Sequence, residues 1–362
     1  MVVPWNARYS FPSQANKAVK ITPRIPPKNG ATFTPGQVIR LEFPAQGYVN
    51  PINTTLAFDV TLQGNNTVGT SEYYRFQNNI QSIFNRVRIM YGSTPLEDII
   101  SYNQIVRNLT EWTATNQNNT IDQVSIAEGI GGYTFTNNGA TISALTTYGP
   151  VNVRQKLIQG VGSGLTGTLK NVPNKSNGAF TATGANYSTR RYQVNLACGL
   201  LTQDKLIPVK FMASQLAIEL QLETANNCIF GTHVGGSGAL PTYGVSNVTL
   251  IPEILEFDAS YGILYIFFSI INFLDAMFLR GLQEGGVPIK FSSWHTFQFT
   301  PSGSQANLQV QERSRSVKAL FAVQTAPSGT SPALTVDTHA TVNSSAAFAS
   351  FMSSYQWRIG GR

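Results

Sequence analysis

Strict alternation of apolar and polar residues is the feature of this sequence that most restricts its fold. Between Leu216 and Leu222 every second residue is Leu or Ile, and Ala, Glu and Gln stand between them. The segment 54–62 repeats the pattern, with Leu, Phe or Val at each even position from 56 to 62. This period of two predicts β-strands with one face buried and one face in solvent, as in an antiparallel sheet.

Strand patterns occur in two stretches of the chain, with a connector between them. In the first stretch we predict strands at 37–44, 54–62, 83–91, 191–197, 206–212, 215–223 and 248–257, and in the second at 289–300 and 316–324. Only 12% of the residues are charged, and the polarity comes from Asn, Gln, Ser and Thr, which suit turns and strand faces. Many short strands with long neutral excursions indicate an all-β sandwich or jelly roll. A length of 362 residues favours two domains.

One short helix is predicted inside the first β-region. Thr94-Pro95-Leu96-Glu97 has the form of a capping box with proline at the first helical position. Apolar residues continue at helical spacing as far as Leu109. The acidic pair Glu97 and Asp98 is then explained by capping and the helix dipole rather than by acid chemistry.

The stretches 116–149 and 160–184 are rich in Gly, Asn, Thr and Ser. Loops of this length are typically functional surface or disordered. Gly160, Gly162 and Gly164 resemble a phosphate-binding loop, but the Lys-Ser/Thr ending is missing. We predict a flexible loop there.

The most hydrophobic stretch, 263–274, lies between the two β-regions. Its length of about twelve residues is short of the roughly twenty that a membrane-spanning helix needs. A buried linker is therefore predicted.

Residues 1–30 hold five prolines and little periodicity, which predicts an extended N-terminal arm. The arm is basic, through Arg8, Lys17, Lys20, Arg24 and Lys28, and the whole chain has a net charge of +7. Such a charge fits weak attraction to nucleic acid or to an anionic membrane, and it fits a solvated tail equally well.

The N-terminal residues and the two cysteines indicate in which cellular compartment the chain folds. The first residues, 1–5, lack a basic region followed by an apolar one, so the sequence does not predict secretion. Cys198 and Cys228 are too few for a disulfide framework, which favours a reducing compartment.

No pattern of residues supports catalysis. His233, His295 and His339 lie in different segments, no pair has metal-ligand spacing, and neither cysteine lies near a second one. Gly-x-Ser-x-Gly and His-Glu-x-x-His are both missing from the sequence. We predict no enzyme activity, no cofactor, and no catalytic, cofactor-binding or metal-binding residues.

Arg86 and Arg88 alternate with Val87 and Ile89 on one predicted strand. Aromatic residues interleaved with basic ones on an exposed face would suit stacking on nucleic-acid bases. Alternation of polar and buried residues on a sheet explains the same pattern, and we favour that explanation.

Five segments, in this order, resemble the double jelly-roll major capsid proteins of tailless icosahedral DNA viruses, especially those of polinton-like viruses and nucleocytoplasmic large DNA viruses. They are 83–92 leading into the capped helix with Tyr102-Asn103, then 206–212 followed by 216–222, then 247–256, 316–324 and 355–361. The resemblance covers most of residues 35–362.

The resemblance implies a structural protein of the virion without an active site. Two jelly rolls would lie side by side, and three copies would form a pseudo-hexagonal capsomer that tiles an icosahedral shell, assembled in the cytoplasm or nucleus of a host cell. The implied partners are further copies of the chain, neighbouring capsomers, and penton or minor capsid proteins. The basic arm would face inward, toward an internal membrane or the genome, and the loops at 113–149 and 160–188 would face outward.

The resemblance also gives domain limits. We expect an extended arm at 1–30, a first jelly roll at 31–257, a linker at 258–287 and the start of a second jelly roll at 288–362. Against the family pattern, 262–274 resembles an insertion, and sequencing of the transcript tests whether it is encoded in the mature message. The family usually continues beyond Arg362, which predicts a truncated second jelly roll and an intact mass above 39.4 kDa for the natural protein.

Other functions remain open at this point. A jelly-roll lectin or viral attachment protein would use the long loops to hold glycans. A single jelly-roll capsid protein of a small virus would carry 288–362 as an appendage. An enzyme is the third alternative.

Overall fold

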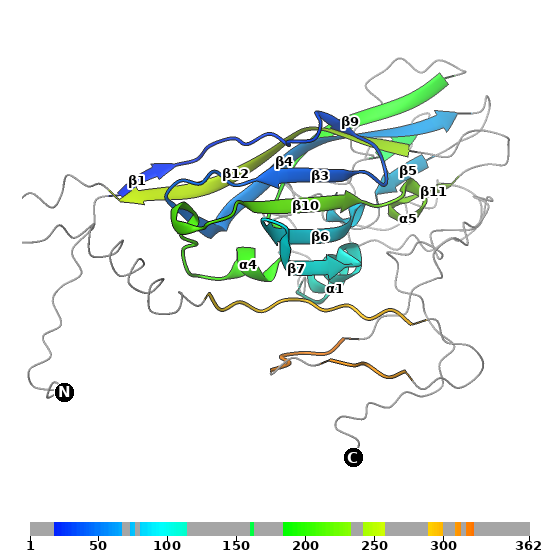
Figure 1. The fold of residues 1–362 in the computed structure, drawn as a ribbon. Helices are drawn as coiled ribbons and strands as arrows, with labels where there is room; N and C mark the ends of the chain where they lie inside the picture. Colours follow the sequence, from blue (N-terminus) through cyan, green and yellow to red (C-terminus); the bar gives the residue numbers. More distant parts are fainter. Residues whose placement is uncertain are drawn as a thin grey trace, which may run out of the picture.

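The computed structural model describes residues 18–66, 73–76, 80–113, 160–162, 184–232, 242–257, 289–299, 308–312 and 316–321. Two antiparallel sheets lie face to face within these residues (Figure 1). Sheet A has the order β1 (Ala18–Ile21), β12 (Thr242–Phe257), β4 (Tyr48–Asn66), β9 (Gly184–Val194), and β2 (Thr32–Phe33) also pairs with β12. Sheet B has the order β3 (Val38–Glu42), β10 (Leu216–Leu222), β6 (Phe84–Tyr91), β7 (Thr94–Ile100).

The chain crosses between the two sheets at nearly every step. Counting β1 and β2 as one position, the strands belong in chain order to sheets A, B, A, B, B, A, B and A. The two successive strands in one sheet, β6 and β7, form a hairpin. Eight positions in this order are those of a jelly roll. The predicted all-β jelly-roll fold is therefore confirmed for the described part of 18–257.

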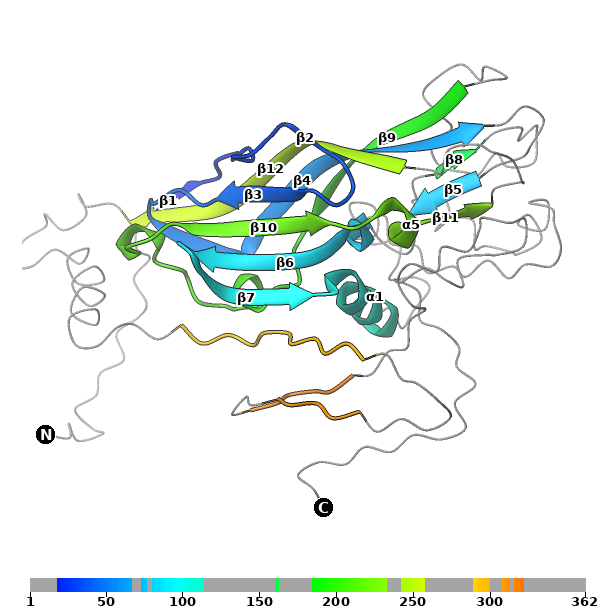
Figure 2. The same cartoon turned by 45° about the vertical axis from the view of Figure 1, so that its right-hand side comes forward.

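A small third sheet lies at one end of this sandwich (Figure 2). The sheet has the order β11 (Ile229–Thr232), β5 (Tyr73–Phe76), β8 (Gly160–Gly162). The helices are α1 (Tyr102–Thr113), α4 (Gly199–Thr202) and α5 (Ala225–Cys228), with 3-10 turns η2 (Ile80–Ile83) and η5 (Val209–Phe211).

The predicted helix exists, but its predicted start was wrong. Residues 94–100 form β7, and the helix begins at Tyr102. Gly92, with φ +59°, turns the chain so that β7 runs antiparallel to β6. Thr94 pairs with Tyr91 at one end of this hairpin, and Ile100 pairs with Arg86 at the other. Pairing with the preceding strand thus prevailed over the capping pattern, and Pro95 is tolerated because β7 is an edge strand.

Two other predictions of secondary structure need correction. Residues 206–212 form no strand: Ile207 makes an isolated bridge to Val49, and the turn η5 follows. The segments 289–299 and 316–321 are extended but are not assigned as strands. Among the described residues they have no hydrogen-bonded ladder partner, which strand assignment requires. The second jelly roll stays a prediction.

The predicted N-terminal arm is already part of the sandwich where the structure describes it. Residues 18–21 pair with β12 as β1, and Ile25 bridges to Leu250. β1 has only four residues, too few for a period of two to stand out, and the prolines at 23, 26 and 27 end any alternation after it. Residues 1–17 lie outside the described part, as do the predicted linker 258–287 and most of the long loops.

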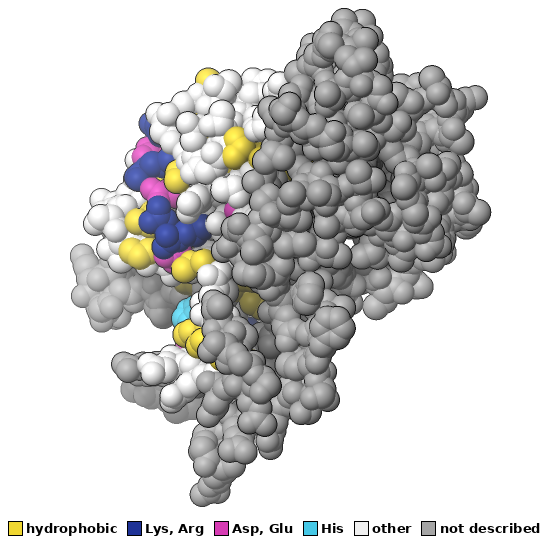
Figure 3. All heavy atoms as spheres, turned by 90° about the vertical axis from the view of Figure 1, so that its right-hand side faces the viewer, with side chains coloured by type: hydrophobic (Ala, Val, Ile, Leu, Met, Phe, Trp, Pro, Cys, Tyr) yellow, Lys and Arg dark blue, Asp and Glu magenta, His cyan; other side chains and the backbone are white. Residues whose placement is uncertain are grey.

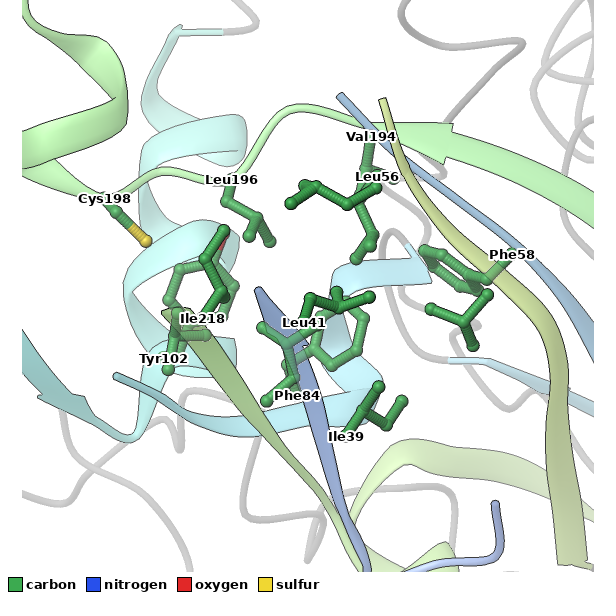
Figure 4. Close-up of a cluster of buried hydrophobic side chains, with 14 of the residues drawn as sticks. Ile39, Leu41, Leu56, Phe58, Phe84, Tyr102, Val194, Leu196, Cys198 and Ile218 are labelled. Atoms are coloured by element: carbon green, nitrogen blue, oxygen red, sulfur yellow. The ribbon is translucent and has the colours of Figure 1, made fainter. Parts of the chain in front are cut away.

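The core lies between sheets A and B (Figure 4). The alternation in the sequence places Leu56 and Phe58 of β4 opposite Ile39 and Ile218 of sheet B, all at most 1% exposed. Phe58 and Phe84 meet edge to face across the two sheets, with ring centroids 5.6 Å apart. Burial of this kind supplies most of the free energy that holds a sandwich together.

Candidate functional site

The described residues contain no group of His, Cys, Asp and Glu side chains that could hold a metal ion. His295 lies at the surface with Nδ1 3.0 Å from an oxygen of Glu312. His233 and His339, the other candidates from the sequence, lie outside the described residues. The described part therefore offers surfaces and buried polar contacts, rather than a set of catalytic groups, as candidates for function.

The acidic pair on β7 is split between the two faces of sheet B. Glu97 points into the molecule and is 3% exposed, while the side chain of Asp98 is 32% exposed on the outer face. Successive residues of a strand point to opposite faces, so these two carboxyls cannot act together.

Glu97 is held by three donors from two other segments. Its Oε1 accepts from Gly199 N at 2.8 Å and from Ser293 Oγ at 3.1 Å, and its Oε2 accepts from Leu200 N at 3.1 Å. Burial raises the pKa of this carboxyl, and the hydrogen bonds from Gly199, Leu200 and Ser293 oppose that rise. Glu97 therefore links β7 to α4, which supplies two of the donors, and to the segment 289–299, which supplies the third.

A row of alternating charges crosses the outer face of sheet B. Register places Arg40, Glu219, Arg88 and Asp98 side by side on β3, β10, β6 and β7. Arg88 pairs with Glu219 at 2.7 Å, Arg40 pairs with Glu219 at 3.0 Å, and Arg86 Nε donates to Asp98 Oδ1 at 2.7 Å. Figure 3 shows Lys and Arg intermixed with Asp and Glu on one side of the described surface.

This row decides between the two explanations of Arg86 and Arg88. Both arginines lie on the outer face, Val87 and Ile89 are fully buried, and carboxylates of sheet B pair with the arginines. The favoured explanation, polar-out alternation on a sheet, is confirmed. Since each guanidinium already has an acidic partner, the face carries little free positive charge for nucleic acid.

Two lysines of the predicted basic arm are also paired. Lys20 forms an ion pair with Glu253, and Lys28 lies 3.6 Å from Glu42. Arg24 is exposed, and Arg8 and Lys17 lie outside the described residues. Contact of this arm with a membrane or genome stays a prediction.

The ends of the strands that lead into the long loops gather at one end of the sandwich (Figure 1). There Glu223, 4% exposed, accepts from Asn103 Nδ2 at 3.1 Å and from Asn227 Nδ2 at 3.0 Å. The hydroxyl of Tyr243 donates to the backbone oxygen of Glu223. A buried network thus ties α1, α5, β10 and β12 beneath the loops.

Glu97, Glu223 and Gly199 were not singled out by the sequence as members of a site. Some of their partners lie about a hundred or more residues away along the chain: Gly199 is 102 residues from Glu97, and Asn103 is 120 from Glu223. One signal for Glu97 was available in the sequence: it is a carboxylate at a position that would point inward if 94–100 were a strand. The signal is visible only once 94–100 is recognised as a strand.

No helix among the described residues has the length and apolarity needed to span a membrane. The apolar stretch 263–274 lies outside those residues.

Comparison with known proteins gives matches among solved structures alone. No protein-family model matches the sequence, and no curated protein matches it. The chain is similar to a structure titled "Crystal structure of mavirus major capsid protein" (8% identity, 73% of this chain, 54% of that chain, TM-score 0.40). It is also similar to "Faustovirus major capsid protein" (15% identity, 70% and 57%, TM-score 0.35) and to "PBCV-1 virus capsid, quasi-atomic model" (10% identity, 70% and 46%, TM-score 0.33).

This chain spans about half the length of those solved structures. Two of them are major capsid proteins, and the third is a virus capsid. Because the TM-scores lie below 0.5, the assignment of a jelly roll rests on the order of strands in sheets A and B.

Proposed function

We propose that the protein is a structural subunit of a viral capsid, which trimerises into pseudo-hexagonal capsomers that tile an icosahedral shell. The observation that carries the proposal is the jelly roll of sheets A and B with the later segment 289–299 packed on its flank. A sandwich followed by a second region for which the sequence predicts strands suits a building block with two similar halves.

The surface chemistry supports a role in assembly. Charges on the outer face of sheet B are already paired within the chain. Such a face can approach a neighbouring molecule without leaving an unpaired charge buried, which is the costly outcome at an interface. Charged residues form only 12% of the chain, in keeping with large contact areas between subunits.

The arrangement of the loops supports an orientation in the shell. The described chain ends that lead into 114–159, 163–183 and 233–241 lie at one end of the sandwich, which is also the end that holds the Glu223 network (Figure 2). In the proposed capsomer this end faces outward. The opposite end, where β1 begins, faces the interior.

Light scattering during size exclusion and electron microscopy of the purified chain test this proposal together. We expect a particle of three times the 39.4 kDa chain mass, with a pseudo-hexagonal outline. A monomer that is retained on a glycan column would overturn the proposal in favour of an attachment protein. A shell in which 288–362 packs as an appendage would overturn the double jelly roll in favour of a single one.

A further inference from the structure

Residues 289–299 run as an extended chain beside β7 and α4, along the edge of sheet B. Figures 1 and 2 both show this gold segment next to β7. Ile289, Phe291 and Trp294 are half-buried and pack against the core of the first sandwich. An edge strand left open offers its backbone to other chains, so a segment in this position protects β7.

A polar contact fixes the middle of the segment. Ser293 donates its hydroxyl to Glu97, whose two oxygens also accept from the backbone of Gly199 and Leu200. Among the described residues, no Lys or Arg forms an ion pair with Glu97. A buried carboxylate without a cation needs hydrogen bonds to remain charged, and the segment supplies one of the three.

A second, independent observation comes from Gly199. A Cβ atom on this residue would stand 1.7 Å from the backbone oxygen of Ser292. The φ angle of Gly199 is not in the left-handed region, so backbone conformation does not demand glycine. The close approach of 289–299 does demand it, because any other residue would occupy the place of the Ser292 carbonyl.

The segment in turn holds the other described residues beyond it. Trp294 packs against Phe321 with ring centroids 6.1 Å apart, and His295 contacts Glu312. At the far end, Gln298 donates to the hydroxyl of Ser101, at the junction of β7 and α1. Residues 308–312 and 316–321 are thus positioned by their contacts with 289–299.

We propose that Glu97 and Gly199 form a built docking site for residues 289–299 of the same chain, and that this site sets where the C-terminal part lies on the first jelly roll. Glu97 acts as a positioning residue that selects the hydroxyl of Ser293. Gly199 acts by leaving room for the backbone of Ser292. The inference concerns contacts within one chain and does not depend on the proposed role in a shell.

Limited trypsin digestion of the full chain, read by mass spectrometry, tests the docking site through cleavage after Lys290. Gly199→Ala is expected to speed this cleavage by more than tenfold, because the segment leaves the sandwich, and to leave cleavage after Arg88, within β6, unchanged. Gly244→Ala is the matched control, because its added Cβ meets nothing nearer than 3.9 Å. Unchanged cleavage after Lys290 in Gly199→Ala overturns the proposal.

A milder pair of variants covers the case in which Gly199→Ala fails to fold. Ser293→Ala removes one hydrogen bond, so cleavage after Lys290 is expected to be about fivefold faster. Ser292→Ala makes the same chemical change at the neighbouring residue and keeps the backbone oxygen, so no change is expected. Equal cleavage rates in the two serine variants contradict a role for Glu97.

Discussion

Glu97 and Asp98 are neighbours on β7, yet one carboxylate lies in the interior against Gly199 and the other lies on the surface against Arg86. Their surroundings shift the two pKa values in opposite directions: burial raises the pKa of Glu97, and the hydrogen bond from Arg86 lowers the pKa of Asp98. Two adjacent acids therefore give the fold opposite dependences on pH.

The first prediction concerns Glu97. Because its pKa is raised in the folded state, its protonation favours folding. This contribution is fully present below the unfolded pKa of about 4.3 and is lost as pH rises through the folded pKa. Wild type is therefore expected to gain stability relative to Glu97→Gln as pH falls from about 7 toward 4. Urea unfolding of both proteins across this range measures the difference, and a difference that shrinks toward acid contradicts the burial of this carboxyl.

The second prediction concerns Asp98, for which the sign is reversed. Its pKa is lowered in the folded state, so its contribution is present above the unfolded pKa of about 3.9 and is lost as pH falls through the folded pKa. The pair with Arg86 is partly exposed, so Asp98→Asn is expected to cost no more than about 1 kcal/mol near neutral pH. The same urea series measures it, with Asp204→Asn as a control because the Asp204 side chain is 79% exposed. An Asp98→Asn effect that grows toward acid would contradict the pairing with Arg86.

The strands that carry this chemistry differ in how much of them the sequence predicts. Leu216–Leu222 was predicted closely, because alternation follows directly from a sheet with one buried face. Residues 94–100 were mistaken for a helix start, because their strand conformation depends on pairing with β6. A capping box is a local pattern and carries no information about that partner.

The docking site shows the same limit at longer range. Ser293 meets Glu97 across 196 residues of sequence, and no local pattern at either residue indicates the other. The sequence around Gly199 carries no pattern that indicates a role for this glycine. Its function becomes visible only when the backbone of Ser292 is placed beside it.

The third prediction concerns the contact between the sheets. Phe84 and Phe58 are both fully buried and meet edge to face. Phe84→Ala is expected to lower the free energy of unfolding by about 3–5 kcal/mol, through lost burial and the cavity left behind. The control is Ile52→Ala, which shortens an aliphatic side chain that is 50% exposed. It is expected to change the free energy of unfolding by about 0.5 kcal/mol or less. Similar losses in the two variants, measured by urea unfolding, would contradict a core centred on this pair.

The fourth prediction concerns the hydroxyl of Tyr102. This hydroxyl donates to Gln81 Oε1 and accepts from Ala197 N at 2.8 Å, and Tyr102 is fully buried. Tyr102→Phe leaves a buried acceptor on Gln81 and a half-buried donor on Ala197 without that partner, so a loss of about 1–3 kcal/mol is expected in urea unfolding.

Tyr91→Phe is the matched control for this hydroxyl. Tyr91 also accepts a backbone hydrogen bond, from Ala213 at 3.0 Å, but in an exposed place where water can replace it. Its expected loss is smaller, about 1 kcal/mol or less. A larger loss in Tyr91→Phe than in Tyr102→Phe would contradict the burial of the Tyr102 network.

The fifth prediction concerns the two cysteines, which are both buried and free. Burial raises the pKa of both thiols, and the nearby charge of Glu97 raises the pKa of Cys198 further. The thiolate is the reactive form, so both cysteines are expected to resist a disulfide reagent such as DTNB in the native protein. Both should react at once in denaturant, and Ser214→Cys, at an exposed position, should add one rapidly reacting thiol to the native protein. Rapid native labelling without that substitution would mean that the sandwich opens around Cys198 or Cys228. Slow labelling at the rate of global unfolding would place both thiols inside one cooperatively folded unit.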